Sequence, residues 1–453
     1  MHAEGATTIL TAGARTVSGL PPDADTLFKV CSVTKVFTGV LLADATLRGR
    51  VTLADEAQRH LARVKVPRHT DGPVRLEHLA TYSAGLPWQP SNFRTKSDGG
   101  YTDEAWRSFL EGYALPYAPG RGFQYGNVGF ALLGEALAEN AGEPVAALFR
   151  NRLFAPLGLE RSGFIGERAD DANRAQGVDV HGKLVPLDLD EPSQLAACGI
   201  ETSASDLVRF LGAHFDAPHP LHRAMRLALE PRRHATGDFD GFDVGLGWFL
   251  EPDTHRAFKT GGIEGYRSIV GLDLERRTAA VVLAADERID TGMLFDGIFN
   301  DVADAALDPP ASAASPVAVP PSAVPYDVAF DDGLRLVGIE APEHVASGGE
   351  ATVRYFYRVE RTPRFEWRAF VHADANGERV RSNHVLARPM RTLAPGTLVE
   401  DVVTLRFRPD LKNTTFTLYG GFYRGDERMG FASAKDDKRV VGPKLRIVPS
   451  VPR

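Results

Sequence analysis

The chain has 453 residues, which is long for one domain and suggests two. Hydrophobic residues make up 43% and charged residues 25%, as is usual for a globular protein with a substantial core. The net charge is −7 without a basic run, and no apolar stretch reaches the length of a membrane helix, so we expect neither nucleic-acid binding nor a membrane span.

One strand, at about residues 7–15, is predicted before a buried helix that begins near Ser32. Apolar residues recur at helical spacing after Ser32, and Gly49 is a plausible C-cap. Lys35 follows Ser32 by three residues, so both side chains lie on one face. A serine hydroxyl needs a neighbouring base to become a nucleophile, and a half-buried lysine can serve because desolvation favours its neutral amine. A Ser-x-x-Lys motif alone is weak evidence and requires context.

Two further motifs supply that context. They are Tyr125-Gly126-Asn127 and Lys259-Thr260-Gly261. Serine β-lactamases and penicillin-binding proteins carry three such motifs in this order. Residues 76–87, 117–120 and 258–285 add matching segments around them. The sequence therefore resembles the class C β-lactamase branch of that superfamily over about residues 5–305.

The resemblance implies an α+β fold of the β-lactamase/transpeptidase type, in which a helical region packs against an antiparallel sheet built from both ends of the domain. Helices are predicted within residues 76–160 and from residue 203, and strands from about residue 245 to 285. The family normally begins with a helix and a strand before its first hairpin. Here either the true start lies upstream, or the sheet lacks an edge strand.

The resemblance also implies catalytic roles for Ser32, Lys35 and Tyr125. Ser32 would attack a carbonyl carbon and form an acyl-enzyme, while Lys35 and Tyr125 would share the proton transfers. A tyrosine can act as a base only if nearby cations stabilise its phenolate. Lys35 and Lys259 are expected to supply them.

Substrate binding falls to the remaining motif residues and the glycine that follows them. These are Asn127, Lys259, Thr260, Gly261 and Gly262. By the resemblance, Asn127 would hydrogen-bond a substrate amide, and Lys259 and Thr260 would bind a carboxylate. The backbone N–H groups of Ser32 and Gly262 would form the oxyanion hole.

No metal or cofactor is expected. The two cysteines, Cys31 and Cys198, are too few for a disulfide framework or a thiolate metal site. His214, His219 and His222 cluster, but prolines lie between them and no carboxylate spacing fits a zinc helix, so a surface loop is predicted.

One position departs from the class C pattern. Asp290 stands where class C enzymes place an asparagine that helps to hold the β-lactam carboxylate. Two carboxylates repel, which argues against efficient β-lactam hydrolysis. Arg288 is near enough in sequence to compensate.

Residues 308–325 are rich in Pro, Ala, Ser and Val and predict a semi-rigid linker between domains at 1–307 and 326–453. Alternating apolar residues after it predict an all-β sandwich of about seven strands. This region resembles immunoglobulin-like modules appended to bacterial surface proteins. We expect a potential binding module whose partner the sequence does not name.

The first functional hypothesis is a serine acyl-hydrolase acting on a small-molecule or peptide substrate, either a β-lactam or a D-amino-acid amide or peptide. A promiscuous esterase on the same scaffold is the first alternative. A non-hydrolytic penicillin-binding sensor or scaffold is the second. The resemblance implies a periplasmic or secreted protein, although residues 1–5 lack the basic and then apolar run of a signal peptide.

Overall fold

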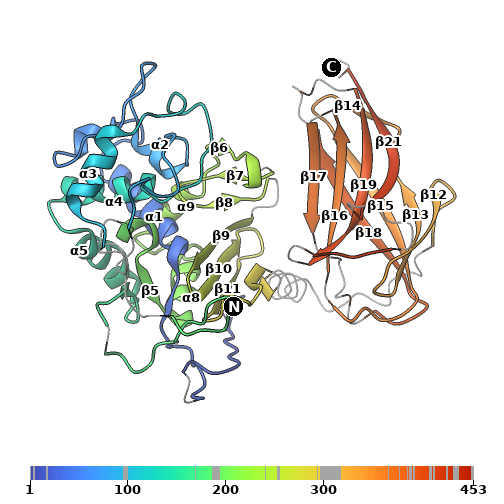
Figure 1. Ribbon diagram of the computed structural model, residues 1–453, viewed down its shortest axis with the longest axis horizontal. Coiled ribbons are helices and arrows are strands. Elements are labelled where there is room, and N and C mark those ends of the chain that lie inside the picture. The colour runs from blue at the N-terminus through green and yellow to red at the C-terminus, as the bar shows by residue number, and fades with distance from the viewer. Residues whose placement is uncertain are drawn as a thin grey trace. The chain divides into compact units, whose positions relative to one another are not determined.

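A computed structural model gives the architecture of the chain (Figure 1), which divides into two compact units, Met1–Leu307 and Asp308–Arg453. The structure describes residues 2–3, 6–16, 19–94, 100–168, 170–185, 194–239, 241–252, 256–292, 294–295, 318–365, 367–376, 378–384, 386, 390, 393–407, 411, 414–424, 427–431 and 438–449.

The N-terminal unit is organised around an antiparallel sheet of eight strands in the order β2-β1-β11-β10-β9-β8-β7-β6. The strands are β1 (His2–Ala3), β2 (Ala6–Thr7), β6 (Arg233–His234), β7 (Asp243–Val244), β8 (Phe249–Leu250), β9 (Arg256–Ile263), β10 (Tyr266–Asp273) and β11 (Thr278–Ala284). His2 pairs with Ala279, so the sheet draws strands from both ends of the unit, as predicted.

The predicted strand at residues 7–15 is wrong in position. Only Thr7 of that range belongs to a strand, and the described residues 8–15 form none. The pairing instead uses β1 and β2, which are two residues each. Such short strands carry too few alternating residues to produce a recognisable pattern.

A helical region lies on one side of this sheet (Figure 1). Its helices are α1 (Thr34–Leu47), α2 (Leu76–Ala80), α3 (Asp103–Gly112), α4 (Val128–Ala141), α5 (Val145–Phe149) and α6 (Ala155–Leu157). The unit also contains α7 (Leu195–Cys198), α8 (Ala204–Gly212) and α9 (His222–Ala228). A second, three-stranded sheet has the order β3-β5-β4, from β3 (Phe28–Lys29), β4 (Gly163–Phe164) and β5 (Ile200–Thr202).

Helix α1 is central because it is apolar on nearly every side. Residues 34–44 are all buried, and a helix that is hydrophobic all round belongs inside a core. The Phe37 ring stacks on Phe210 of α8 at 4.0 Å between ring centroids. Gly49 follows the helix with φ of 67°, as expected of a residue that ends it.

The C-terminal unit is all-β, as predicted, but has more strands than the seven expected. A four-stranded sheet has the order β12-β13-β15-β18, and a second sheet runs β14-β21-β19-β16-β17 with β20 on β19. The strands are β12 (Val324–Ala329), β13 (Leu334–Glu340), β14 (His344–Ala346), β15 (Glu350–Val359), β16 (Arg368–Ala375), β17 (Glu378–His384), β18 (Leu398–Arg406), β19 (Thr415–Arg424), β20 (Glu427–Arg428) and β21 (Val440–Val448). One core cluster contains residues of both sheets, among them Tyr355 and Phe416.

The predicted linker at residues 308–325 falls mainly outside the described residues. Val324 and Pro325, at its end, already belong to β12 and pair with β13. Proline is tolerated there because β12 lies at the edge of its sheet.

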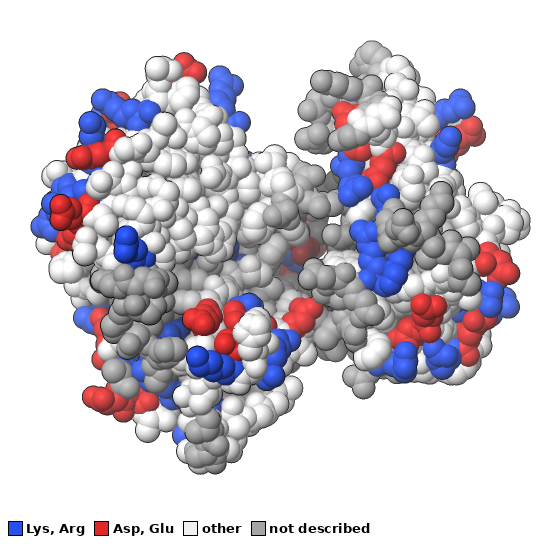
Figure 2. Space-filling view, in the orientation of Figure 1, with Lys and Arg blue, Asp and Glu red and all other residues white. Residues whose placement is uncertain are grey.

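Figure 2 shows Lys and Arg interspersed with Asp and Glu over the visible face of each unit. Among the described residues, no helix is both long and apolar enough to span a bilayer.

Candidate active site

Ser32 lies in a 3₁₀ turn, Cys31–Val33, that leads directly into α1. The predicted position at the start of a buried helix is therefore correct. The side chain is buried, with 4% of its surface exposed. The N–H of Thr34 bonds back to the carbonyl oxygens of Cys31 and Ser32, which closes the turn.

Lys35 is buried and its Nζ meets three oxygen acceptors. It donates to Ser32 Oγ at 2.9 Å, to Asn127 Oδ1 at 2.7 Å and to the Ala197 carbonyl oxygen at 2.9 Å. Burial lowers the pKa of Lys35 well below 10.5. A neutral Nζ at this distance from Ser32 Oγ can accept its proton.

Tyr125 is held between two lysines. Lys259 Nζ donates to the Tyr125 hydroxyl at 2.9 Å, and Lys35 Nζ lies 5.4 Å from the ring centroid. Lys259 is itself fully buried, and burial together with the charge of Lys35 lowers its pKa well below 10.5. Neither lysine forms an ion pair with a carboxylate among the described residues.

The two lysines lie beside Tyr125 as expected, but burial dominates the pKa of its phenol. Burial raises the pKa of Tyr125 to about 12, although a hydrogen bond with Ser32 opposes the increase. Aromatic rings surround the phenol, with Tyr82 at 4.7 Å and Trp88 at 5.3 Å between ring centroids. Desolvation disfavours the phenolate, so the Tyr125 hydroxyl stays protonated at neutral pH.

Strand β9 brings the third motif against the nucleophile turn. A Cβ atom on Gly261 would lie 2.2 Å from the Val30 carbonyl oxygen, so only glycine allows this approach. Ser268, opposite Gly261 on β10, donates from Oγ to the same Val30 oxygen at 3.0 Å. Val30, the residue before Cys31, is thereby attached to the eight-stranded sheet.

The backbone of Gly262 faces away from β10. Ile263 pairs with Tyr266 across a two-residue loop, and the pair that closes such a loop is hydrogen-bonded. The next pair, Gly262 with Arg267, is then not hydrogen-bonded, and the Gly262 N–H points outward. Gly262 and Thr260 are both exposed on β9, whereas Lys259 and Gly261 are buried.

Asn127 precedes α4 and joins Lys35 to a residue that sequence reasoning missed. Its Oδ1 accepts from Lys35, and its Nδ2 donates to Gln194 Oε1 at 3.1 Å. Gln194, the Ala197 carbonyl group and Ser268 carry no motif, and only the folded chain brings them to the site. The three residues predicted to be catalytic, Ser32, Lys35 and Tyr125, lie together with Asn127, Lys259 and Gly261, as the motifs predict.

A family model described as Beta-lactamase matches residues 1–296, well over half of the chain. This chain belongs to the Beta-lactamase family. The Beta-lactamases of Pseudomonas fluorescens and of Escherichia coli (strain K12) are each 30% identical to it, over 235 and 236 residues. These alignments cover 51% and 50% of this chain and 62% and 58% of the two relatives. The chain therefore spans about six tenths of the length of the curated relatives it matches.

Solved structures of this family share the fold. A class C β-lactamase has a TM-score of 0.58 at 19% identity, covering 69% of this chain and 90% of that one. A β-lactamase/D-alanine carboxypeptidase from Pseudomonas syringae has a TM-score of 0.57 at 21% identity, covering 68% and 92%. The predicted α+β fold of the class C type is confirmed.

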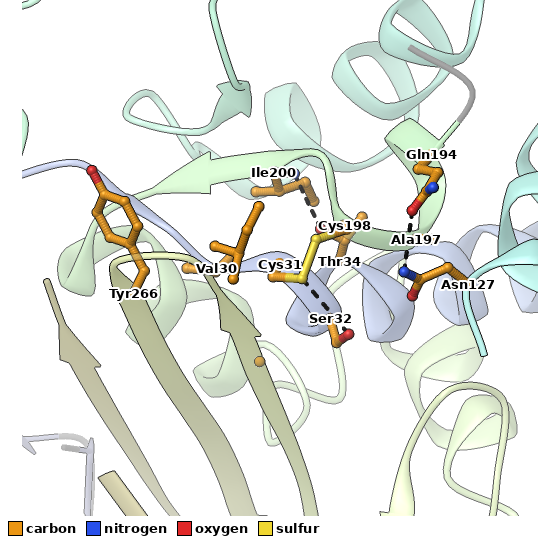
Figure 3. Close-up of a disulfide and its surroundings, with 12 residues drawn as sticks. Val30, Cys31, Ser32, Thr34, Asn127, Gln194, Ala197, Cys198, Ile200 and Tyr266 are labelled. Atoms are coloured by element: carbon orange, nitrogen blue, oxygen red, sulfur yellow. Dashed lines mark hydrogen bonds between the residues drawn. A yellow bond between two sulfur atoms is a disulfide. The ribbon is translucent and has the colours of Figure 1, made fainter. Parts of the chain in front are cut away.

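The cysteines contradict the sequence prediction. Cys31 and Cys198 form a disulfide across 167 residues of sequence (Figure 3). Two isolated cysteines so far apart give no pattern, and they meet because β3 pairs with β5 and sets α7 beside the nucleophile turn.

Two further expectations concern charged groups. Asp290 is exposed after β11, and its place near a substrate carboxylate stays a prediction. The guanidinium of Arg288 pairs with Asp286, with 2.6 Å between Nη2 and Oδ2. His214 is buried rather than in a surface loop, and its Nδ1 lies 3.0 Å from the Phe210 carbonyl oxygen. Within the described ranges, no cluster of His, Cys, Asp and Glu could hold a metal ion.

Proposed function

We propose that the N-terminal unit is a serine acyl-hydrolase that forms an acyl-enzyme on Ser32. Its proposed substrates are β-lactams or amides and peptides of D-amino acids. The observation that carries the proposal is the 2.9 Å contact between Lys35 Nζ and Ser32 Oγ, at a site where burial favours the neutral amine. The names of the Pseudomonas syringae structure and of the two Beta-lactamases support the substrate class.

In the proposed acylation, Lys35 Nζ takes the proton of Ser32 as Oγ attacks the substrate carbonyl carbon. The N–H groups of Ser32 and Gly262 receive the developing oxyanion. Two backbone donors on separate elements, the 3₁₀ turn and β9, suit this purpose because their packing fixes them in advance.

Tyr125 is proposed to protonate the leaving nitrogen, because its raised pKa keeps the phenol protonated. The phenolate that results stands beside Lys259 Nζ, which stabilises it for the next step. In deacylation, water gives a proton to the Tyr125 phenolate and attacks the ester. Lys35 then returns its proton to Ser32 Oγ, so the cycle closes without loss or gain of protons.

A substrate carboxylate would complement the charge of the site. Lys259 Nζ is buried, and neither it nor Lys35 forms an ion pair with a carboxylate among the described residues. Thr260 is exposed next to Lys259 on β9 and can donate a hydrogen bond to an anion. Direct contact with a carboxylate is therefore assigned to Thr260. Lys259 is buried and contacts the Tyr125 hydroxyl, so it would act on the carboxylate only through its electrostatic field.

Substrate profiling tests the proposal. The full chain is assayed with nitrocefin, D-Ala-D-Ala peptides and p-nitrophenyl esters, with Ser32→Ala as the control for each. We expect turnover of nitrocefin or the D-peptide that the control lacks. Turnover of esters alone would replace the proposal with an esterase, and acylation without release would replace it with a penicillin sensor.

A further inference from the structure

The Cys31–Cys198 disulfide joins the nucleophile turn to a short helix that, with the residue before it, contacts Lys35 and Asn127. Cys31 directly precedes Ser32, and its Sγ lies 3.9 Å from Ser32 Oγ (Figure 3). Cys198 is the last residue of α7. Cys31 is buried and Cys198 is partly exposed, so a small reagent can approach the bond from the Cys198 side.

The helix α7 and the residue before it supply three polar contacts to the active site. The Ala197 carbonyl oxygen accepts from Lys35 Nζ at 2.9 Å, and the Ala196 carbonyl oxygen accepts from Thr38 Oγ1 at 2.6 Å. Gln194 Oε1 accepts from Asn127 Nδ2 at 3.1 Å. The position of α7 therefore sets the acceptors around the proposed base and around the amide that faces it.

This helix has little stability of its own. It contains four residues, fewer than a helix needs to be stable in isolation. Two residues beyond Cys198, the Ile200 carbonyl oxygen accepts a hydrogen bond from the Val30 N–H at 3.1 Å. This contact continues the pairing of β5 with β3 in the three-stranded sheet. Along the chain, Cys198 lies between Ala197, which contacts Lys35, and Ile200, which contacts Val30. Its disulfide is therefore the covalent bond that attaches the end of α7 to the nucleophile turn.

Cys31 also adopts a backbone conformation that side chains disfavour. Its φ is 40°, in the left-handed region where glycine is the usual residue. Such a conformation persists only when its surroundings restrain it, and it is common at functional sites. The disulfide is one such restraint, applied to the residue next to the nucleophile.

We propose that the Cys31–Cys198 disulfide is a positioning link for acylation, which holds the nucleophile turn and the Ala197 acceptor of Lys35 in register, and that its reduction slows acylation of Ser32. The inference rests on the proposed function, because it requires Ser32 to be the nucleophile. The two cysteines act through Ser32 and Lys35 and take no part in the chemistry.

The redox step is a two-electron reduction. A water-soluble phosphine attacks one sulfur and breaks the S–S bond. The phosphine is oxidised to its oxide with an oxygen atom from water, and the two sulfurs each gain one proton. No acyl group or substrate takes part, so the reaction can be completed before the assay begins.

The experiment measures the rate at which a fluorophosphonate labels Ser32 in the full chain, with the adduct located by mass spectrometry. Fluoride leaves without protonation, so the rate reports the Ser32–Lys35 pair and not Tyr125. We expect phosphine-treated protein to label about tenfold more slowly, since small displacements of catalytic groups cost such factors. Reoxidation should restore the rate.

Cys198→Ser is the matched variant, because it removes the bond and leaves residues 31–35 unchanged. Without phosphine it should label as slowly as the reduced native chain, and phosphine should not slow it further. The rise of its labelling rate with pH should also move to lower pH, because the Ala197 carbonyl group no longer stabilises the Lys35 ammonium. If the disulfide only stabilised the fold, the labelling rate would rise over the same pH range as in the native chain. If this variant fails to fold, the reduced native chain carries the test.

Three results would overturn the inference. Two free thiols in the untreated protein would show that the bond does not form. Equal labelling rates before and after reduction would show that it does not position the site, while the proposed function would stand. Absence of labelling on Ser32 in the oxidised protein would instead remove the proposed function and the inference with it.

Discussion

Burial is the main influence on the protonation of the residues proposed to be catalytic. Lys35 and Lys259 are fully buried, and the pKa of each lies well below 10.5. The same desolvation raises the pKa of Tyr125 to about 12. Burial therefore favours the neutral amine at Lys35 and the protonated phenol at Tyr125, which are the forms that the proposed acyl transfer requires.

The pH dependence of Ser32 acylation should follow Lys35. The base is inactive while protonated, so the rate rises with pH through the lowered pKa and levels off well below pH 10.5. Stopped-flow labelling between pH 4 and pH 10 measures this rise in rate. Lys35→Arg is the control, since arginine stays charged across this range and should be inactive throughout. A rate increase with its midpoint near pH 10.5 would mean that Lys35 is not desolvated.

Tyr125→Phe should lower kcat for amide substrates by about 10² to 10⁴, the usual effect of losing a general acid. The ring and its aromatic contacts remain, so the melting temperature should change little. Tyr113→Phe is the control, because the Tyr113 hydroxyl donates to the Gly85 carbonyl oxygen at 3.2 Å and not to a residue of the proposed mechanism. Equal kcat values for the two variants would remove the proton transfer from Tyr125.

The strand β9 shows how one element serves both packing and catalysis. Gly261 lets the strand approach Val30, and Ser268 fixes that approach with a hydrogen bond. The motif residues of β9 could be predicted because their order along the chain is specific to one superfamily. Ser268, Gln194 and the Ala197 carbonyl group could not, because their roles depend on contacts between segments distant in sequence.

Gly261→Ala should destabilise the N-terminal unit by about 1–3 kcal/mol, since its Cβ would overlap the Val30 carbonyl oxygen at 2.2 Å. The neighbouring Gly262→Ala is the control. Its Cβ would meet only the Arg267 side chain, at 3.4 Å, and should be accommodated. Denaturant unfolding compares the two variants. Equal stabilities would show that β9 does not lie against the nucleophile turn.

At the scale of the whole molecule, the two units have separate hydrophobic cores. The core clusters of the N-terminal unit lie within residues 30–295, and that of the C-terminal unit within residues 326–447. The sequence predicted the fold class of each unit, because three motifs identify the first and period-two alternation identifies the second. It did not predict the N-terminal strands or the disulfide, which short segments and isolated cysteines do not encode.

Because each core cluster of the described residues lies within one unit, residues 1–307 alone should fold and label on Ser32 at the rate of the full chain. Limited proteolysis should first cut between residues 308 and 325. Labelling rates and melting curves of the two proteins provide the comparison. An insoluble or inactive fragment would show that the sandwich contributes to the catalytic fold.

The most direct test of the account is the identity of the residue that becomes acylated. The full chain is incubated with a fluorescent penicillin or a fluorophosphonate, digested and analysed by tandem mass spectrometry, with Ser32→Ala treated in parallel. Lys35 Nζ lies 2.9 Å from Ser32 Oγ, so the account predicts a single adduct on Ser32 and none on the variant. Undiminished labelling of Ser32→Ala, or an adduct on another residue, would contradict it.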